Sequence, residues 1–333
     1  MSCHRSQLVS AAICAVSLAA SAAGAPLPPL NIDRSQTTVS GISSGGYMAV
    51  QLHVAYSSRF QKGAAVIAAG PYNCAQGAVL TALTRCLGNA SIPVADLIAD
   101  TDKFAKEGLI DATANLSSSK VYIFAGAKDS VVKQATSVAL QDYYQHYLPA
   151  ANVAYKNDVP SEHAFVTDDY GAACDTKGTP FINNCGYDMA GALLQQLYGG
   201  LRARNGSALE GGLIEFDQTT FENGHGMGAS GWLYVPKACA AGTQCRLHVA
   251  LHGCKTNVTD IGQEFVRNAG YNRWADSNNI VVLYPQTGKG AVNSCWDWWG
   301  YDDANHAKKA APQVTAIIKM IDALSRPAPA AGK

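Results

Sequence analysis

The sequence predicts an α/β fold with a mostly parallel central sheet that is flanked by helices. Apolar, β-branched runs alternate with helical stretches along most of the 333 residues, which is typical of such a sheet. The composition, 48% hydrophobic and 15% charged, is sufficient for a large core. Residues 41–45 read GISSG, the spacing of a sharp turn that lifts a serine out of a strand and into a helix.

The first half of the chain contains four expected strands and three expected helices. The strands cover residues 37–40, 64–69, 120–125 and 152–155, and the helices lie near 46–57, 132–147 and 187–202. A cysteine-bearing excursion, at about 71–118, separates the second strand from the third. The strand at 37–40 leads directly into the serine turn, although several strands ordinarily precede such a turn.

The second half supplies the strands that are missing before the turn. Strands are expected at 213–216, 231–236, 247–253 and 280–285, with helices near 260–276 and 314–324. If this block is read ahead of residue 37, it completes the sheet, and its last helix becomes the crossover into strand 37–40. The sequence therefore predicts a circularly permuted α/β-hydrolase fold with one catalytic domain over residues 26–325. The join of the original ends is expected in the polar stretch 204–212. Two domains split near residue 205 are the alternative, which is disfavoured because neither half alone has a complete sheet.

Residues 1–25 read as a signal peptide. Arg5 precedes the apolar run 8–20, and small residues follow where a signal peptidase could cut. A frayed N-terminal helix is the alternative, whereas the run is too short and too rich in alanine for a membrane anchor. We expect a secreted protein, extracellular or periplasmic, with a disordered tail at 326–333.

The charge balance argues against nucleic-acid and membrane partners. Removing the signal removes Arg5 and no acid, which leaves 24 basic against 25 acidic residues. Such a surface has no basic patch for phosphates or anionic lipids and suits a neutral substrate. We expect a monomer.

The cysteines predict disulfides rather than a metal site. Cys3 and Cys14 leave with the signal, and eight cysteines remain, an even number that suits an exported chain. There is no Cys-x-x-Cys pair and no histidine pair at helical spacing, so neither a metal nor another cofactor is expected. Many connectivities are possible, and the spacing favours four pairs: Cys74–Cys86, Cys174–Cys185, Cys239–Cys245 and Cys254–Cys295.

Ser43 is the expected nucleophile of the serine turn. It lies at the centre of the motif between Gly41 and Gly45, whereas centring the motif on Ser44 would place Ile42 where the strand and helix approach closely. The backbone N–H of the residue after the nucleophile, here Ser44, ordinarily donates to the oxyanion.

A base and an orienting acid are expected in the order serine, acid, histidine. Asp129 follows strand 120–125, and His163 lies in the loop after the next strand, so both lie at the catalytic edge of the sheet. Asp129 as a helix N-cap is the alternative. The remaining histidines fit less well: His53 and His146 on helices, His225 in a glycine-rich loop, His248 in the core, His252 in the oxyanion turn and His306 at a helix start.

The turn after strand 247–253 is the expected source of the second oxyanion donor. The N–H of Cys254 would donate there, and a disulfide to Cys295 would fasten the turn to the tryptophan-rich segment 296–299. Simple packing is the alternative explanation for these tryptophans.

Five segments together resemble the secreted, single-domain poly(3-hydroxybutyrate) depolymerases of the permuted α/β-hydrolase type: SGISSGGYMAVQLHVAYSS, AAGPYNCA, HVALHGC, GYNRWADSNNIVVLYPQ and CWDWWG. The resemblance covers nearly all of the chain after the signal. It implies Ser43, Asp129 and His163 as the catalytic triad, and the N–H groups of Ser44 and Cys254 as the oxyanion hole. It also implies Trp298 as a residue of the substrate crevice and the same four disulfides.

The resemblance implies a serine esterase that hydrolyses poly(3-hydroxybutyrate), or a related short-chain polyester, to oligomers and monomers. Its expected partner is a polyester chain or a hydroxyalkanoate oligomer. Many bacterial members append a polymer-binding domain, and we expect this chain to act without one, through exposed apolar residues around the crevice. A carboxylesterase for feruloyl or acetyl esters of plant polysaccharide and a non-catalytic polyester-binding protein are the alternatives.

Overall fold

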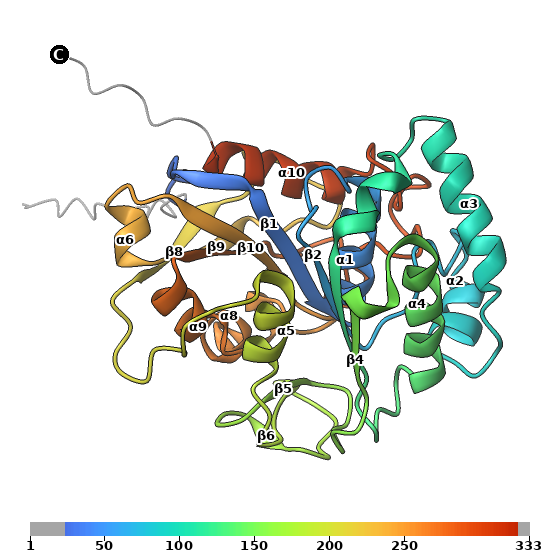
Figure 1. Cartoon of the computed structure of the whole chain (residues 1–333), viewed down its shortest axis with the longest axis horizontal. Helices are drawn as coiled ribbons and strands as arrows, with labels where there is room; N and C mark the ends of the chain where they lie inside the picture. Colours follow the sequence, from blue (N-terminus) through green and yellow to red (C-terminus); the bar gives the residue numbers. More distant parts are fainter. Residues whose placement is uncertain (1–23, 326–333) are drawn as a thin grey trace, which may run out of the picture.

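The computed structural model describes residues 24–325, which form one α/β unit around an eight-stranded sheet (Figure 1). Of the predicted signal peptide only residues 24 and 25 are described, and the predicted disordered tail lies outside the described residues. No helix within residues 24–325 has both the length and the hydropathy needed to cross a bilayer.

The sheet is mostly parallel, as predicted. From one edge to the other its strands are β4 (Val153–Lys156), β3 (Lys120–Phe124), β2 (Gly63–Ile67), β1 (Ile32–Ile42), β10 (Cys245–Leu251), β11 (Ile280–Tyr284), β9 (Ser230–Val235) and β8 (Gly212–Asp217). The pairs from β4 to β11 are parallel, whereas β9 is antiparallel to both of its neighbours.

The strand order is that of a permuted chain. If the chain is read from β8 to its last helix and then on from β1, the order in sequence matches the order in the sheet, apart from an exchange of β10 and β11. β1 lies between β2 and β10, so the two halves of the sequence meet at the strand that carries the serine turn. The predicted permuted α/β-hydrolase fold is therefore confirmed in its sheet topology.

Helices cover both faces of the sheet (Figure 1). One face packs against α1 (Ser44–Ala55), α4 (Gln134–Tyr147) and α10 (Pro312–Leu324), and the other against α5 (Met189–Tyr198), α8 (Glu264–Asn268) and α9 (Tyr271–Asn278). Strand residues alternate between the two cores: Val39, Val249 and Leu283 face α1 and α10, whereas Ala250 and Val282 face the opposite core. This alternation explains why the central strands are apolar throughout.

The excursion between β2 and β3 is helical and lies at one side of the sheet. It contains the short α2 (Val79–Thr81), the π-helical turn η1 (Ala82–Cys86), α3 (Val94–Lys106) and the 3-10 turn η2 (Thr113–Ser118). The disulfide between Cys74 and Cys86 closes its first part.

Three local predictions were wrong. The helix expected near 260–276 is broken into α7 (Val258–Ile261), α8 and α9, because Gly262 and Gly270 adopt φ of 62° and 89° and end each helical segment. The expected long loop after β4 holds a small sheet of β5 (Phe165–Thr167), β7 (Ile182–Asn184) and β6 (Ala172–Ala173). His306 lies in a buried turn instead of at a helix start.

Candidate active site

Ser43 lies between the end of β1 and the start of α1. Its φ of 55° and ψ of −122° are unusual for a residue with a side chain, and such strain marks a sharp turn that the surrounding structure enforces. The backbone N–H of Ser43 donates to the carbonyl of Ile67 at the end of β2, 2.9 Å away. The turn is thus held against the neighbouring strand while its side chain faces a cavity.

The two motif glycines are required by the close approach of backbones. A Cβ on Gly41 would lie 2.1 Å from the carbonyl oxygen of Gly45, and a Cβ on Gly45 would lie 2.3 Å from that of His252. No real side chain tolerates such contacts, so both positions need glycine. The elbow therefore packs tightly against the end of β10, where the expected oxyanion turn begins.

His163 and Asp129 form a buried pair. The Nδ1 of His163 lies 2.8 Å from Oδ2 of Asp129, and their side chains are 9% and 1% exposed. The backbone N–H groups of Val131 and Val132 donate to Oδ1 of Asp129 at 2.8 Å each. Asp129 thus both stabilises a turn and orients the histidine. It is not the N-cap of α4, because that helix begins at Gln134 with Lys133 before it. Nδ1 is bonded to the carboxylate, and Nε2 of His163 has no hydrogen-bond partner within residues 24–325.

Backbone hydrogen bonds hold the two loops of this pair together. The N–H of Ala127 donates to the carbonyl of Val159 at 2.8 Å, and that of Lys128 to Ser161 at 3.1 Å. A Cβ on Gly126 would lie 2.4 Å from the Ser161 carbonyl oxygen. The loops after β3 and β4 therefore lie side by side at the same edge of the sheet, joined by backbone hydrogen bonds.

Two side chains fix the peptide that joins Gly253 to Cys254. His252 Nδ1 donates to the carbonyl oxygen of Gly253 at 2.7 Å, and Thr256 Oγ1 donates to the same oxygen at 2.9 Å. In a planar trans peptide the N–H of Cys254 points away from that oxygen, so its direction is fixed as well. A Cβ on Gly253 would lie 3.4 Å from the Cβ of Ser43, which shows how closely the turn approaches the serine.

The His252 ring is itself fixed on its other side. Its Nε2 accepts from the backbone N–H of Thr287 at 3.1 Å, while the indole N–H of Trp296 donates to the His252 carbonyl at 3.0 Å. The ring is fully buried, and burial lowers its pKa to about 4. His252 is therefore neutral at neutral pH, with its proton on Nδ1.

The eight described cysteines form the four predicted pairs: Cys74–Cys86, Cys174–Cys185, Cys239–Cys245 and Cys254–Cys295. Two of them bear on the site. The bridge Cys254–Cys295 connects the expected oxyanion turn to the tryptophan-rich segment, and Cys174–Cys185 joins the residue after β6 to the residue after β7.

Trp298 forms part of the cavity wall. It is 5% exposed and stacks on Tyr47 of α1 with ring centroids 4.0 Å apart and planes 10° apart. The Tyr47 hydroxyl donates to the carbonyl of Cys86, 2.6 Å away. The indole plane is therefore held by α1, which begins directly after Ser43.

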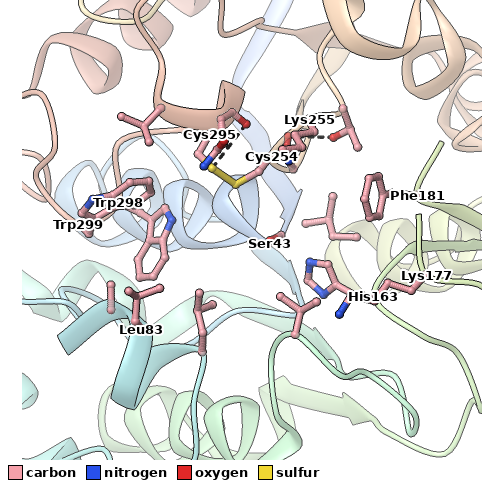
Figure 2. Close-up of a pocket in the computed structure, with 18 of the residues that line it drawn as sticks. Ser43, Leu83, His163, Lys177, Phe181, Cys254, Lys255, Cys295, Trp298 and Trp299 are labelled. Atoms are coloured by element: carbon pink, nitrogen blue, oxygen red, sulfur yellow. Dashed lines mark hydrogen bonds between the residues drawn. A yellow bond between two sulfur atoms is a disulfide. The ribbon is translucent and has the colours of Figure 1, made fainter. Parts of the chain in front are cut away.

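Ser43, His163, Cys254 and Trp298 line one cavity of about 430 Å³. In Figure 2 Ser43 lies at its centre, with Trp298, Trp299 and Leu83 on one side and His163, Lys177 and Phe181 on the other. Most of the lining is apolar, including Ile42, Val79, Leu87, Val131, Phe265 and Val292. Val79, Leu83 and Val292 are 57%, 59% and 45% exposed, so apolar side chains also rim the entrance.

Sequence reasoning missed several lining residues. Val79 and Leu83 lie in the excursion before β3, and Phe181 and Lys177 lie in the loop that holds the small sheet. The only signal for these segments was their cysteines, which indicated loops closed on themselves. The histidines that were set aside are buried structural residues or lie away from the cavity; His248, for example, bonds to Thr38 and Ser40 between strands.

The fold and the site geometry define the α/β-hydrolase class, and the comparisons with known proteins narrow it. The family model described as Esterase PHB depolymerase matches residues 229–328. The chain is 58% identical over 303 residues to a poly(3-hydroxybutyrate) depolymerase of Delftia acidovorans, a match that covers 90% of this chain and 61% of that one. It is 39% identical over 320 residues to a polyhydroxybutyrate depolymerase of Talaromyces funiculosus, covering 91% and 93%.

Solved structures give the same result. The PHB depolymerase of Penicillium funiculosum superposes with a TM-score of 0.85 at 37% identity, over 90% of this chain and 98% of that one. A PHB depolymerase variant complexed with an R3HB trimer matches equally well. The chain belongs to the poly(3-hydroxybutyrate) depolymerase family of carboxylic ester hydrolases. It spans less than two thirds of the length of the Delftia relative.

Proposed function

We propose that this chain is a secreted serine esterase that hydrolyses poly(3-hydroxybutyrate) or a related short-chain polyhydroxyalkanoate. The observation that carries the proposal is that Ser43 and the His163–Asp129 pair open into the same apolar cavity. Residues 26–325 form its single catalytic domain, which acts as a monomer.

In the proposed mechanism Ser43 is the nucleophile. Its Oγ attacks an ester carbonyl while Nε2 of His163 takes its proton, and Asp129 stabilises the resulting imidazolium. The carbonyl oxygen becomes an oxyanion facing the N–H groups of Ser44 and Cys254. The carbon–oxygen bond of the ester then breaks, and His163 returns the proton to the departing alcohol.

The remaining acyl-enzyme is hydrolysed by the reverse sequence. His163 takes a proton from water, the hydroxide adds to the acyl carbon, and the proton passes to Ser43 as the carboxylic acid leaves. Two backbone N–H groups donate to the other oxygen of Asp129 and hold the carboxylate that orients His163. The backbone around Val131 and Val132 therefore helps to position the catalytic triad.

The cavity suits a neutral polyester. Such a chain presents carbonyls and methyl groups without charge, and apolar lining around a few polar groups recognises it. Trp298 would form one wall of the crevice, while the exposed Val79, Leu83 and Val292 would contact polymer at the rim. The relatives of known name support this substrate class.

The test is clearing of a poly(3-hydroxybutyrate) suspension by the wild type and two serine variants. Ser43→Ala should abolish clearing. Ser44→Ala should stay within a few-fold of wild type, because the buried Ser44 hydroxyl has no hydrogen-bond partner among the described residues and only the backbone is used. Clearing by Ser43→Ala would refute the nucleophile assignment. A feruloyl ester hydrolysed in place of polymer would favour the plant-polysaccharide esterase.

Secretion has its own test. Four disulfides suit an oxidising compartment, and a signal peptide over residues 1–25 would deliver the chain there. Mass spectrometry of the culture supernatant should find a mature N-terminus close to residue 26. Active enzyme confined to the cytoplasm with its N-terminal segment intact would contradict export.

A further inference from the structure

The cavity around Ser43 has a charge pattern that a neutral polymer does not require. Among its lining residues only Lys177 and Lys255 carry a permanent charge, and none is an acid. Neither ammonium group lies within 4.0 Å of a carboxylate of residues 24–325. A largely apolar crevice thus holds two cations whose charge no salt bridge neutralises within the described chain.

Lys177 lies on the side of the catalytic pair. Its Nζ donates to Oγ of Ser130 at 2.9 Å, and Ser130 directly follows Asp129. The loop of Lys177 is tied to the histidine loop, because the N–H of Phe165 donates to the carbonyl of Phe181 at 2.8 Å. The Glu162 carboxylate interacts electrostatically with Lys177, yet both of its oxygens accept from the one backbone N–H of Ser130, and Glu162 is not part of the lining.

Lys255 projects from the oxyanion turn. It directly follows Cys254, adopts a φ of 56°, and its backbone N–H donates to the carbonyl of Asn293 at 3.0 Å. The backbone is thus held in place while the side chain is exposed at the cavity. Figure 2 shows Lys255 beside Cys254, with Lys177 next to His163 and both away from the tryptophans.

The chemistry of the ester assigns a direction to the bound chain. During acylation His163 protonates the departing alcohol, so the alcohol segment lies next to His163. In a hydroxyalkanoate chain the segment on the alcohol side of any ester runs to the carboxyl terminus. The free carboxylate of a short oligomer therefore lies on the side of His163, where Lys177 is placed.

We propose that Lys177 and Lys255 bind the terminal carboxylate of short, soluble hydroxyalkanoate oligomers, so that the enzyme prefers an oligomer acid to the same oligomer with a capped carboxyl. This inference rests on the proposed function. The polymer has one carboxylate per long chain, so the lysines add little to its binding. They add most to the binding of the released oligomers, and the enzyme is thereby directed towards completing the degradation of its own products.

The experiment compares the hydroxybutyrate trimer as the free acid and as its methyl ester. The readout is the ratio of kcat/KM for the acid to kcat/KM for the ester, measured at low ionic strength. Replacing both lysines (Lys177→Met with Lys255→Met) should lower this ratio about three- to tenfold, the range for two exposed charge pairs. Lys255→Arg keeps the charge and should retain most of the ratio.

Two controls make the result specific. Lys128→Met removes a lysine that pairs with Asp175 outside the cavity and should leave the ratio unchanged. Added salt should lower the wild-type ratio towards that of the double variant, because screening weakens exposed charges.

A double variant with the wild-type ratio would overturn the carboxylate site while leaving the esterase proposal intact. A wild type that hydrolyses neither trimer would overturn both, so the two failures are distinguishable. Thermal unfolding of the double variant at the wild-type temperature confirms that a lowered ratio does not come from misfolding.

Discussion

Replacing His252 by phenylalanine should slow catalysis although the histidine does not line the cavity. The change keeps an aromatic ring against Trp296, whose ring centroid lies 5.2 Å away. It removes the Nδ1–H that donates to the carbonyl of Gly253 and the Nε2 that accepts from Thr287. The peptide that aims the Cys254 N–H then has one donor left, from Thr256.

The magnitude follows from what that N–H does. One oxyanion donor is worth about 100- to 1000-fold in kcat. Thr256 still restrains the peptide, so we expect a partial loss of about ten- to a hundredfold. The Thr287 N–H, left buried without a partner, should cost about 1–3 kcal/mol of stability. An enzyme of this size should therefore melt several degrees lower and remain folded at 20 °C.

The assay is hydrolysis of p-nitrophenyl butyrate, with kcat and KM determined separately. Because the oxyanion forms only in the transition state, kcat should fall while KM stays near the wild-type value. Thr256→Val should also lower kcat, by a smaller factor. His146→Phe lies on the exposed surface of α4 and should leave both kcat and KM unchanged. A folded His252→Phe enzyme with kcat within twofold of wild type would refute the reasoning.

Three further predictions concern the frame around the site. Breaking the Cys254–Cys295 bridge by a double Cys→Ser change opens a loop with a sequence separation of 41. Calorimetry should show that the free energy of unfolding falls by about 4 kcal/mol, and ester hydrolysis should show a reduced kcat. An unchanged kcat would mean that the bridge does not position the oxyanion turn. Gly45→Ala should abolish soluble expression or activity, because the added Cβ would lie 2.3 Å from the carbonyl oxygen of His252. Gly206→Ala is the control, since its Cβ would meet no atom of the described chain within 4 Å and activity should be unchanged. Equal activities of the two variants would contradict the close packing of the elbow. Burial lowers the pKa of His248 to about 3, so the unfolded chain takes up a proton before the folded one as the pH falls from about 6.5. The free energy of unfolding, measured in urea, should therefore decrease from pH 6.5 towards pH 3. A free energy of unfolding that stays constant over this range would contradict the prediction.

The sequence predicted the sheet and the edge at which the candidate residues gather, because both depend on local patterns. Apolar runs mark strands, and residues that follow parallel strands meet at one edge. Asp129 and His163 could be chosen on that ground, and the structure places them 2.8 Å apart. Their catalytic roles stay predictions until variants are measured.

The loops were less predictable. The helix expected at 260–276 fails at Gly262 and Gly270, where the chain needs positive φ, and apolar periodicity alone does not register such breaks. The lining from Val79 and Lys177 depends on how two disulfide-closed segments fold back over the sheet. No local pattern encodes that contact, because it is made between residues far apart in the chain.

The start of the sheet strand β1 and the end of the last helix meet at the rim of the sheet opposite the crevice. The N–H of Leu30 donates to the carbonyl of Leu324 at 2.7 Å, and the guanidinium of Arg34 donates to Ser325 at 3.1 Å. β1 runs from this rim to Ser43 through eleven residues, a length of roughly 35 Å. A tether at either place would leave the crevice facing outward. An enzyme anchored to a bead or fused to another protein through these residues should still reach the surface of a polyester film.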